Sequence, residues 1–309
     1  MTTALYTHET CIRHDPGMGH PESSDRLKVV LAALDEKVFA SLDRIEAPLA
    51  TIEQIARVHP IDHVTRILDE IPKQGYARID ADTVVSPASG EAALRAAGAV
   101  CAAVDAVIAG TVKNAFCAIR PPGHHAEPAI PMGFCVFNSI AVGAAQARSQ
   151  HGMERIAAID FDVHHGNGTQ AIFYDEPNLF YASTHQSPLY PGTGSPRETG
   201  CSNNIVNVPL PPGAGSDMFR EAMTLRVLPA LRRFAPEILL VSAGFDAHAD
   251  DPLAGLRFTD DDYRWVTDEL ARVADECCEG RLVSALEGGY DLAALSRCAA
   301  IHVKTLMQA

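Results

Sequence analysis

Apolar runs alternate with segments of helical periodicity along nearly the whole chain. The short apolar runs predict eight strands, at Ala4–Tyr6, Arg44–Glu46, Ala115–Ile119, Arg155–Ile159, Leu179–Ser183, Ile205–Val208, Ile238–Val241 and Leu282–Leu286. Segments in which apolar residues recur every three or four positions predict helices at Ser24–Leu34, Ile61–Ile71, Ser89–Ile108, Ser139–Arg148, Ser216–Phe234, Asp260–Cys278 and Leu292–Met307. Alternating strands and helices are typical of βαβ units, so we predict an α/β fold.

Two of the predicted strands are apolar without interruption, at Ile156–Ile159 and Ile238–Val241. Such runs suit a parallel sheet that helices cover on both faces. Clusters of proline and glycine at 121–123, 188–194 and 209–215 are short and fall between strand runs, so they indicate loops rather than linkers. We therefore predict a single domain over residues 1–309.

Composition narrows the classes of function. The 309 residues are 47% hydrophobic, enough for a large core. The net charge of −14 disfavours nucleic acid and suits cationic ligands such as lysine-rich peptides and polyamines, although acidity can equally serve solubility alone. No signal peptide or membrane span is recognisable, and the eight cysteines show no C-x-x-C spacing. We expect a cytoplasmic protein that binds neither membrane nor nucleic acid.

Five polar motifs each follow directly after a predicted strand. They are Arg120-Pro-Pro-Gly-His124-His125, Asp160-x-Asp162-x-His164-His165, Ser183-Thr184-His185, Gly244-Phe-Asp246 and Glu287-Gly288-Gly289-Tyr290. Ligands of open α/β sheets bind in the crevice outside the carboxyl ends of the strands. The motifs therefore predict one functional site at that edge.

Asp162, His164 and Asp246 form a candidate metal-ligand set. Asp162 and His164 are two residues apart, so both side chains can lie on one side of an extended strand end. Asp246 is a carboxylate at the end of an apolar run, where leaving it unpaired is costly. Two carboxylates and one imidazole leave coordination positions open, which is typical of a catalytic metal site.

His124, His125 and Tyr290 are candidates for the remaining chemistry. Taken singly, adjacent histidines in a loop are more often surface residues, and a tyrosine is as often a core residue. Asp160 and Asn167 are candidate partners for the two histidines, and a histidine oriented by Asp is more basic than one oriented by Asn. A phenol can stabilise the oxyanion of metal-assisted amide hydrolysis.

These motifs resemble, in order and over almost the entire chain, those of the zinc-dependent histone deacetylase superfamily. The similarity extends to Gly133-Phe134-Cys135, the run from Asp160 to Gln170, Pro191–Gly194 and Asn207–Gly213. Asn167, in place of Asp, is similar to the class II branch and its bacterial relatives. The resemblance implies an arginase/deacetylase fold, with one eight-stranded parallel sheet between two helical layers.

The resemblance also implies a role for each site residue. It implies Zn²⁺ bound by Asp162, His164 and Asp246. His125 paired with Asn167 acts as general base, His124 paired with Asp160 stays charged, and Tyr290 polarises the acyl carbonyl. A structural K⁺ is implied at Asp160, Asp162, His164, Ser183 and Thr184, and an outer K⁺ at a site that includes the carbonyl of Phe173.

By the same resemblance, a narrow tunnel accepts the substrate. Gly133, Phe134 and Tyr190 wall the tunnel for an acyl-lysine stem, whose methylenes favour an apolar, aromatic lining. Leu253, Gly288, His20 and Glu22 complete the substrate-binding set implied by the resemblance; His20 and Glu22 belong to the family's first loop near the entrance, and Arg26 matches its internal floor.

Two substrate classes are open, an acylated lysine in a peptide or protein and an acetylated polyamine. Polyamine-selective relatives carry a Glu seven residues after the zinc Asp, where this chain has Leu253. An apolar side chain offers no charged partner to a distal amine, so we favour acyl-lysine, although Asp250 and Asp251 lie close by in the sequence.

Two other interpretations are weaker. An arginase-like site with two Mn²⁺ ions needs a further acid on each strand end, where this chain has Gly166 and His248. An acyl-lysine reader without catalysis is disfavoured because all the expected groups are present. The sequence leaves the oligomeric state open, a homo-oligomer included, together with the acyl length and the choice of Zn²⁺ or iron.

Overall fold

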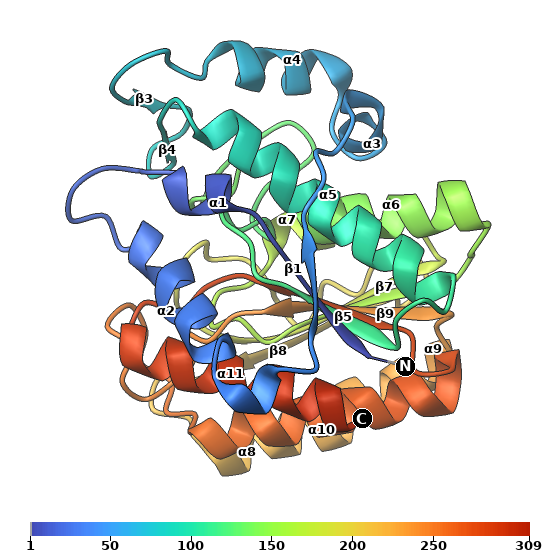
Figure 1. The fold of residues 1–309 in the computed structure, drawn as a ribbon. Coiled ribbons are helices and arrows are strands. Elements are labelled where there is room, and N and C mark those ends of the chain that lie inside the picture. Colours follow the sequence, from blue (N-terminus) through green and yellow to red (C-terminus); the bar gives the residue numbers. More distant parts are fainter. Residues whose placement is uncertain (1) are drawn as a thin grey trace.

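All eight predicted strands form, and they join in one parallel sheet. The computed structural model describes residues 2–309, so Met1 of the predicted domain lies outside the described residues. The sheet has the order β2-β1-β5-β10-β9-β6-β7-β8 (Figure 1). Its strands are β1 (Thr3–Thr7), β2 (Asp43–Glu46), β5 (Asn114–Cys117), β6 (Ile156–Asp160), β7 (Leu179–Gln186), β8 (Ile205–Leu210), β9 (Ile238–Ala243) and β10 (Leu282–Leu286).

Helices cover both faces of the sheet, as Figure 1 shows. One layer holds α1 (Glu9–Arg13), α3 (Ile52–Ala56), α4 (Ile61–Asp69), α5 (Ser89–Ile108), α6 (Ser139–His151) and α7 (Asn167–Phe173). The other holds α2 (Ser24–Leu34), α8 (Ser216–Ala222), α9 (Leu228–Phe234), α10 (Asp260–Cys278) and α11 (Leu292–Gln308). The three-layer α/β/α architecture is therefore confirmed.

Strand residues alternate between the two cores that these layers enclose. In β9, Leu239 and Val241 pack with α2, α10 and α11, whereas Ile238 and Leu240 pack with α5 and α6. Side chains of successive strand residues point to opposite faces, so a strand that is buried on both must be apolar throughout. This is why the central strands could be recognised from sequence.

Three features of the fold differ from the prediction. The segment predicted as one helix, Ser216–Phe234, contains a π-helical turn at Met223–Val227 between α8 and α9. The hairpin of β3 (Ala77–Arg78) and β4 (Val84–Val85) and the short helices α1, α3 and α7 carry too few residues for a periodic pattern. Helix α7 begins Asn-Gly, a poor helical start, and its Gly168 and Thr169 N–H groups donate instead to His124 O, at 3.0 and 3.1 Å.

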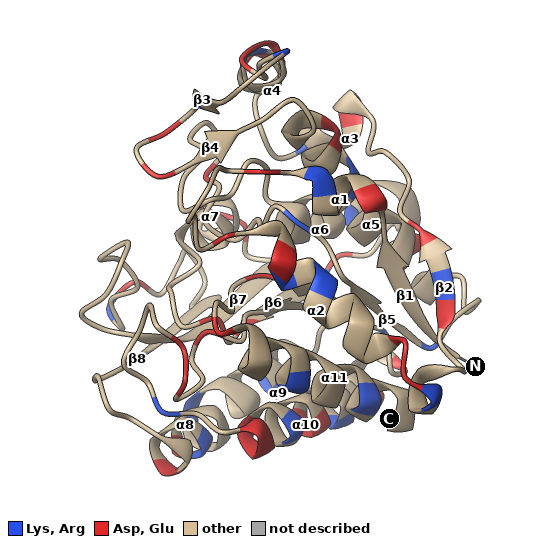
Figure 2. Cartoon of the chain, turned by 60° about the vertical axis from the view of Figure 1, so that its left-hand side comes forward, with Lys and Arg blue, Asp and Glu red and all other residues tan. Residues whose placement is uncertain are grey.

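Charge is distributed unevenly over this frame. Figure 2 shows acidic residues in the loops around the carboxyl ends of the strands, whereas most lysines and arginines lie on helices. Acidic side chains are thus present around the crevice edge of the sheet. Within residues 2–309, no helix has both the length and the apolarity needed to cross a bilayer.

Candidate metal centre and active site

The three predicted metal ligands converge at the carboxyl ends of β6 and β9. Nδ1 of His164 lies 3.0 Å from Asp162 Oδ1 and 3.2 Å from Asp246 Oδ2. One ligand atom from each of the three residues lies within 4.8 Å of the other two, and both carboxylates are completely buried. Asp162 is held by the backbone N–H of Gly288, which donates to Asp162 Oδ2 at 2.8 Å.

These residues fit a divalent metal ion. Asp246 Oδ1 accepts the N–H of Val163 at 2.9 Å, but Asp246 Oδ2, also buried, has no hydrogen-bond partner among residues 2–309. Burial, reinforced by the charge of Asp162, raises the pKa of Asp246 to about 7. Burial lowers the pKa of His164, but the two carboxylates outweigh it and raise the pKa to about 10. Two buried carboxylates facing one imidazole are a ligand set suited to a divalent cation, which would take the place of the proton that they share.

Gly288 is required by close packing at this centre. A Cβ atom at residue 288 would lie 2.0 Å from Asp246 Oδ2 and 2.5 Å from Asp162 Oδ2. Glycine therefore lets the backbone approach both carboxylates and donate to one of them.

The two adjacent histidines are buried beside the triad and have different partners. His124 Nδ1 donates to Asp160 Oδ2 at 3.0 Å, and His125 Nδ1 donates to Asn167 Oδ1 at 2.8 Å. Their ring centroids are 4.1 Å apart. The structure thus brings together the two pairs that the sequence predicted.

The environments of these histidines drive their pKa values apart. Burial lowers the pKa of His124, but the charges of Asp160 and Asp162 outweigh burial, so the pKa is well above its usual value. Burial and then the positive charges of His124 and His164 hold the pKa of His125 well below its usual value. The surroundings therefore favour the charged form of His124 and the neutral form of His125.

Tyr290 lies against the same cavity and is held on several sides. Its N–H donates to Asp251 Oδ2 at 2.7 Å, and its ring lies 4.9 Å from the Arg26 guanidinium carbon. The guanidinium in turn donates through Nε to Gly289 O at 2.6 Å. Arg26 therefore lies beneath the Gly-Gly-Tyr turn, as the resemblance implied, and fixes the phenol from below.

A cavity of about 260 Å³ joins these groups to the surface. Its lining holds Pro122, His124, His125, Gly133, Phe134, His164, Leu189, Tyr190, Leu253, Gly288, Tyr290 and Asp82. His20 is not among the lining residues, but its ring lies edge-on to that of Phe134, with centroids 4.7 Å apart. A narrow cavity with apolar and aromatic walls and a polar floor is suited to an extended aliphatic chain that ends in a reactive group.

Comparison with known proteins agrees with this geometry. The sequence profile of the histone deacetylase domain matches residues 20–306. The chain belongs to the histone deacetylase family. Family membership makes it a hydrolase that acts on amides.

Relatives of this deacetylase-family chain come from several kingdoms. Histone deacetylase 10, chloroplastic, of Oryza sativa is 41% identical, over 91% of this chain and 69% of the rice protein. The histone deacetylase-like amidohydrolase of Pseudomonas aeruginosa is 38% identical, over 98% of this chain and 86% of its own. The solved HD domain of HDA15 superposes with a TM-score of 0.94 at 34% identity, covering 99% of this chain and 88% of that one.

Sequence reasoning missed two residues of the deacetylase cavity, Leu189 and Asp82. Asp82 Oδ1 accepts the N–H of Gly133 at 2.9 Å, and Thr83 Oγ1 accepts the N–H of Phe134 at 3.1 Å. The β3–β4 hairpin thus holds the cavity wall, where Gly133 and Phe134 both have positive φ, 57° and 68°. At residue 133 a Cβ would meet His125 Cδ2 at 2.3 Å, so only glycine fits. The only sequence signal was an acidic, turn-like segment far from the five motifs.

Two further residues support the histidine pair: Tyr181, which the sequence analysis did not single out, and Glu287, which belongs to the fifth motif but was given no role. Tyr181 donates its hydroxyl to Asp160 Oδ2 at 3.1 Å and accepts the N–H of Gly166 at 3.0 Å. Glu287 Oε2 accepts the backbone N–H groups of Gly123 and His124, at 2.7 and 3.2 Å. Tyr181 thus holds the Asp160 carboxylate, the partner of His124, and Glu287 holds the loop that carries the two histidines. Glu287 directly follows the apolar strand β10, which is a signal for a buried polar role, whereas Tyr181 lies within β7 and has no such signal.

The predicted role of Glu22 at the substrate rim is wrong. Its side chain is completely buried, and its carboxylate accepts from Arg120 Nη2 at 2.7 Å and from Arg26 Nη1 at 2.9 Å. Burial opposes the charge, but Arg120 and His14 outweigh it, so the pKa of Glu22 lies below its usual range. Glu22 is the anion between two buried arginines, out of reach of any substrate.

Of the five residues assigned to the inner potassium position, Asp162 and His164 belong to the deacetylase triad, and Asp160, Ser183 and Thr184 lie on the neighbouring strands β6 and β7. Asp160 and Ser183 are direct neighbours on β6 and β7. Asp160 Oδ1 accepts the N–H of Asp162 at 3.1 Å, and Ser183 Oγ bonds His185 Nδ1 at 2.9 Å. Thr184 Oγ1 is buried and has no hydrogen-bond partner within residues 2–309. Carboxylate, hydroxyl and carbonyl oxygens are the donors that a hard cation prefers.

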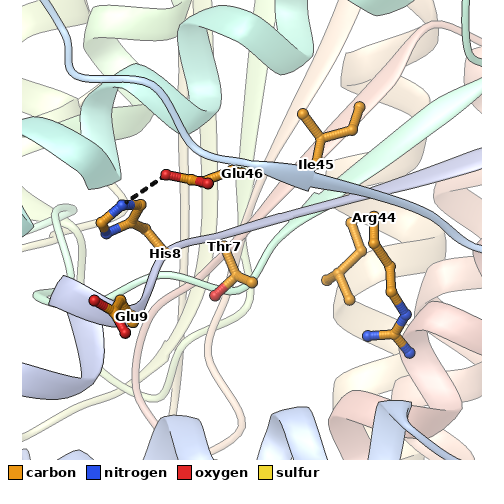
Figure 3. A pocket seen from close by; sticks show the side chains of 7 residues that line it. Thr7, His8, Glu9, Arg44, Ile45 and Glu46 are labelled. Atoms are coloured by element: carbon orange, nitrogen blue, oxygen red, sulfur yellow. Dashed lines mark hydrogen bonds and ion pairs between the residues drawn. The ribbon is translucent and has the colours of Figure 1, made fainter.

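Another hollow, of about 490 Å³, lies at the β1–β2 edge of the sheet and has different chemistry. Figure 3 shows its lining, which includes Thr7, His8, Glu9, Arg44 and Glu46. His8 Nε2 donates to Glu46 Oε1 at 3.0 Å. None of the predicted site residues lines this hollow. The candidate active site is therefore the smaller cavity of about 260 Å³.

His248, the candidate ligand for a second ion, faces away from the triad. Its Nε2 lies 3.1 Å from Asp260 Oδ1, in a cluster with Cys298. Its Nδ1 accepts the N–H of Asp250 at 3.1 Å, so Nε2 carries the proton and donates to Asp260. Arg297 also donates to Asp260, at 3.1 Å. These contacts leave no lone pair of His248 for a metal ion and disfavour the dinuclear alternative.

Proposed function

We propose that this chain is a zinc-dependent deacylase that removes acetyl or other acyl groups from the ε-amine of lysine in peptides or proteins. The observation that carries the proposal is the set of Asp162, His164 and Asp246 at the floor of a narrow aromatic cavity. A zinc ion held by these three residues supplies Lewis-acid chemistry, which polarises a carbonyl and makes water a stronger nucleophile.

The residues of the chain supply the proton transfers and the substrate position. Neutral His125, whose Nδ1 donates to Asn167, keeps Nε2 free to accept a proton from water. Protonated His124 stabilises negative charge beside it and holds a proton for the departing amine. The Tyr290 hydroxyl is positioned to donate to the acyl oxygen as it becomes an oxyanion. Phe134, Tyr190 and Leu253 contact the methylene stem.

Potassium at the inner position is also part of the proposal. Asp160, Asp162, His164, Ser183 and Thr184 would hold K⁺ and neutralise the buried carboxylates there. The buried, unpartnered Thr184 Oγ1 and the adjacency of Asp160 and Ser183 support it.

Acyl-lysine is favoured over acetylpolyamine by the surroundings of Leu253. Leu253 lines the cavity and is 38% exposed, so its apolar side chain is what an elongated substrate meets. Asp251 accepts the N–H groups of Leu253, Tyr290 and Asp291, at 3.0, 2.7 and 3.3 Å, and is 7% exposed. Asp250 lies 3.6 Å from both His248 and Arg297. Asp251 is thus committed within the protein, whereas the Asp250 side chain is 60% exposed. The preference for acyl-lysine therefore rests on Leu253 itself, which offers a distal amine no charge at this point of the rim.

We expect a higher kcat/KM for an acetyl-lysine peptide than for N-acetylputrescine, and Leu253→Glu should shift this ratio towards the polyamine by about tenfold. A carboxylate at the rim gives a charge-assisted partner to the distal amine, worth about 1.5 kcal/mol or more. Leu253→Gln is the matched control, since it adds polarity without charge. A higher kcat/KM of the wild type for N-acetylputrescine would refute the choice of substrate, and equal ratios for the Glu and Gln variants would refute the role of charge.

A reducing compartment is the proposed location. All eight cysteines are free thiols, six of them buried. Two plant relatives are named chloroplastic, so the proposal covers reducing compartments in general, of which the cytoplasm is one.

A further inference from the structure

Three backbone carbonyl groups converge on one side-chain nitrogen at the end of α7. The oxygens of Phe173, Glu176 and Leu179 lie 2.9, 3.1 and 2.8 Å from Nδ2 of Asn204. Asn204 immediately precedes β8 and is 2% exposed. A buried point surrounded by carbonyl oxygens is suited to a cation or to a hydrogen-bond donor.

The outer potassium ion implied by the resemblance does not fit this position. Phe173 O, the expected ligand, accepts the N–H of Glu176 at 3.1 Å as well as the Asn204 amide. Glu176 O likewise accepts the N–H of Leu179 at 2.9 Å as well as the same amide. Because a carbonyl oxygen has two lone pairs, these contacts use its accepting capacity.

The orientation of the Asn204 amide follows from its other contacts. Asn204 Oδ1 accepts the N–H of Ser202 at 3.3 Å, on the side away from the three carbonyls. Turning the amide over would place Oδ1 against three carbonyl oxygens and leave the Ser202 N–H facing an NH₂ group. The amino group is therefore the end that faces the carbonyls.

We propose that the side-chain amide of Asn204 takes the place of the outer cation, so that this chain binds no potassium at the Phe173 position. The two amide N–H groups carry partial positive charge and are covalently attached, so together with the N–H groups of Glu176 and Leu179 they supply donors to the three carbonyls at any salt composition. The Asn204 contacts also bear on the position of His125. Helix α7 ends at Phe173 and begins at Asn167, which is the hydrogen-bond partner of His125. Asn204 thus anchors the far end of the helix that orients His125, without a dissociable ion.

Rubidium, a heavy analogue of potassium, tests this directly in crystals of the wild-type protein. We expect no anomalous peak between the carbonyl oxygens of Phe173, Glu176 and Leu179 in crystals grown with RbCl, and the Asn204 side chain in its present place. An Rb⁺ peak at that point, with the Asn204 side chain displaced, would overturn the proposal. A peak at Asp160 and Ser183 reports on the inner position separately.

Asn204→Ala tests the same idea in solution by freeing the three carbonyls. We expect its melting temperature to depend more strongly on K⁺ than that of the wild type, by roughly a few degrees when tetramethylammonium is replaced by K⁺. Asn178→Ala, which removes an exposed amide from the same turn, should respond like the wild type. An equal response of all three proteins would show that the carbonyls are no latent cation site and would count against the proposal. If Asn204→Ala fails to fold, the anomalous map of the wild-type crystals with Rb⁺ decides whether a cation binds between the three carbonyls.

Discussion

Replacing Tyr290 with phenylalanine is expected to lower kcat on an acetyl-lysine peptide by about 100- to 1000-fold, with little change in KM. The hydroxyl has its main effect on the oxyanion, which exists only in the transition state, and loss of one such donor typically costs about 2.7–4 kcal/mol. The aromatic ring, which packs near Arg26 and Phe134, is retained in the variant. Steady-state kinetics with released acetate as the readout measures the effect.

Tyr263→Phe is the matched control for Tyr290→Phe. Tyr263 is equally a buried tyrosine near the centre, packed on Phe245, but its hydroxyl has no hydrogen-bond partner within residues 2–309. Removing the Tyr263 hydroxyl should leave kcat unchanged. If Tyr290→Phe also kept wild-type activity, the oxyanion role would be wrong and the non-catalytic reader would regain support.

Replacing Glu22 with glutamine should lower the free energy of unfolding by about 3–5 kcal/mol, because it leaves Arg120 and Arg26 as buried cations without their anion. Both guanidinium groups are completely buried, so solvent cannot compensate. Urea denaturation of the zinc-loaded protein, followed by circular dichroism, gives this difference from the shift of the midpoint.

The exposed pair of Glu9 and Arg13 offers the control for Glu22→Gln. Glu9→Gln makes the same chemical change on a solvent-exposed i,i+4 ion pair, which is worth about 0.3–0.5 kcal/mol. A loss for Glu22→Gln as small as that for Glu9→Gln would show that the buried arginines are stabilised without Glu22.

The sheet could be predicted because its strands carry their own signal. Residues 238–241 are apolar on every position, since helices cover both faces, and the polar motif that follows ends the run abruptly. The same contrast located the metal triad, because Asp162, His164 and Asp246 all follow apolar strands. The local pattern of apolar and polar residues was therefore enough to predict strands and site residues wherever a buried apolar run is followed directly by polar residues.

Contacts between distant segments could not be predicted in this way. Glu22 meets Arg120 across 98 residues, and nothing in its neighbourhood distinguishes an interior anion from one at the rim. Asp82 reaches Gly133 from a hairpin too short to show a strand period. The contacts of the Asn204 amide with three carbonyls, from which we propose that no outer ion binds, also join segments about 25 to 31 residues apart in the chain.

Titration of the metal-free protein with Zn²⁺ tests the proposed deacylase most directly, with acetate release from an acetyl-lysine peptide and bound zinc measured in the same samples. We expect acetate release to rise in proportion to bound zinc and to stop rising at one zinc per chain, because Asp162, His164 and Asp246 form one three-ligand site. Asp246→Asn should bind less zinc and lose activity in parallel. Full zinc binding without acetate release, or activity that continues to rise up to two ions per chain, would contradict the account.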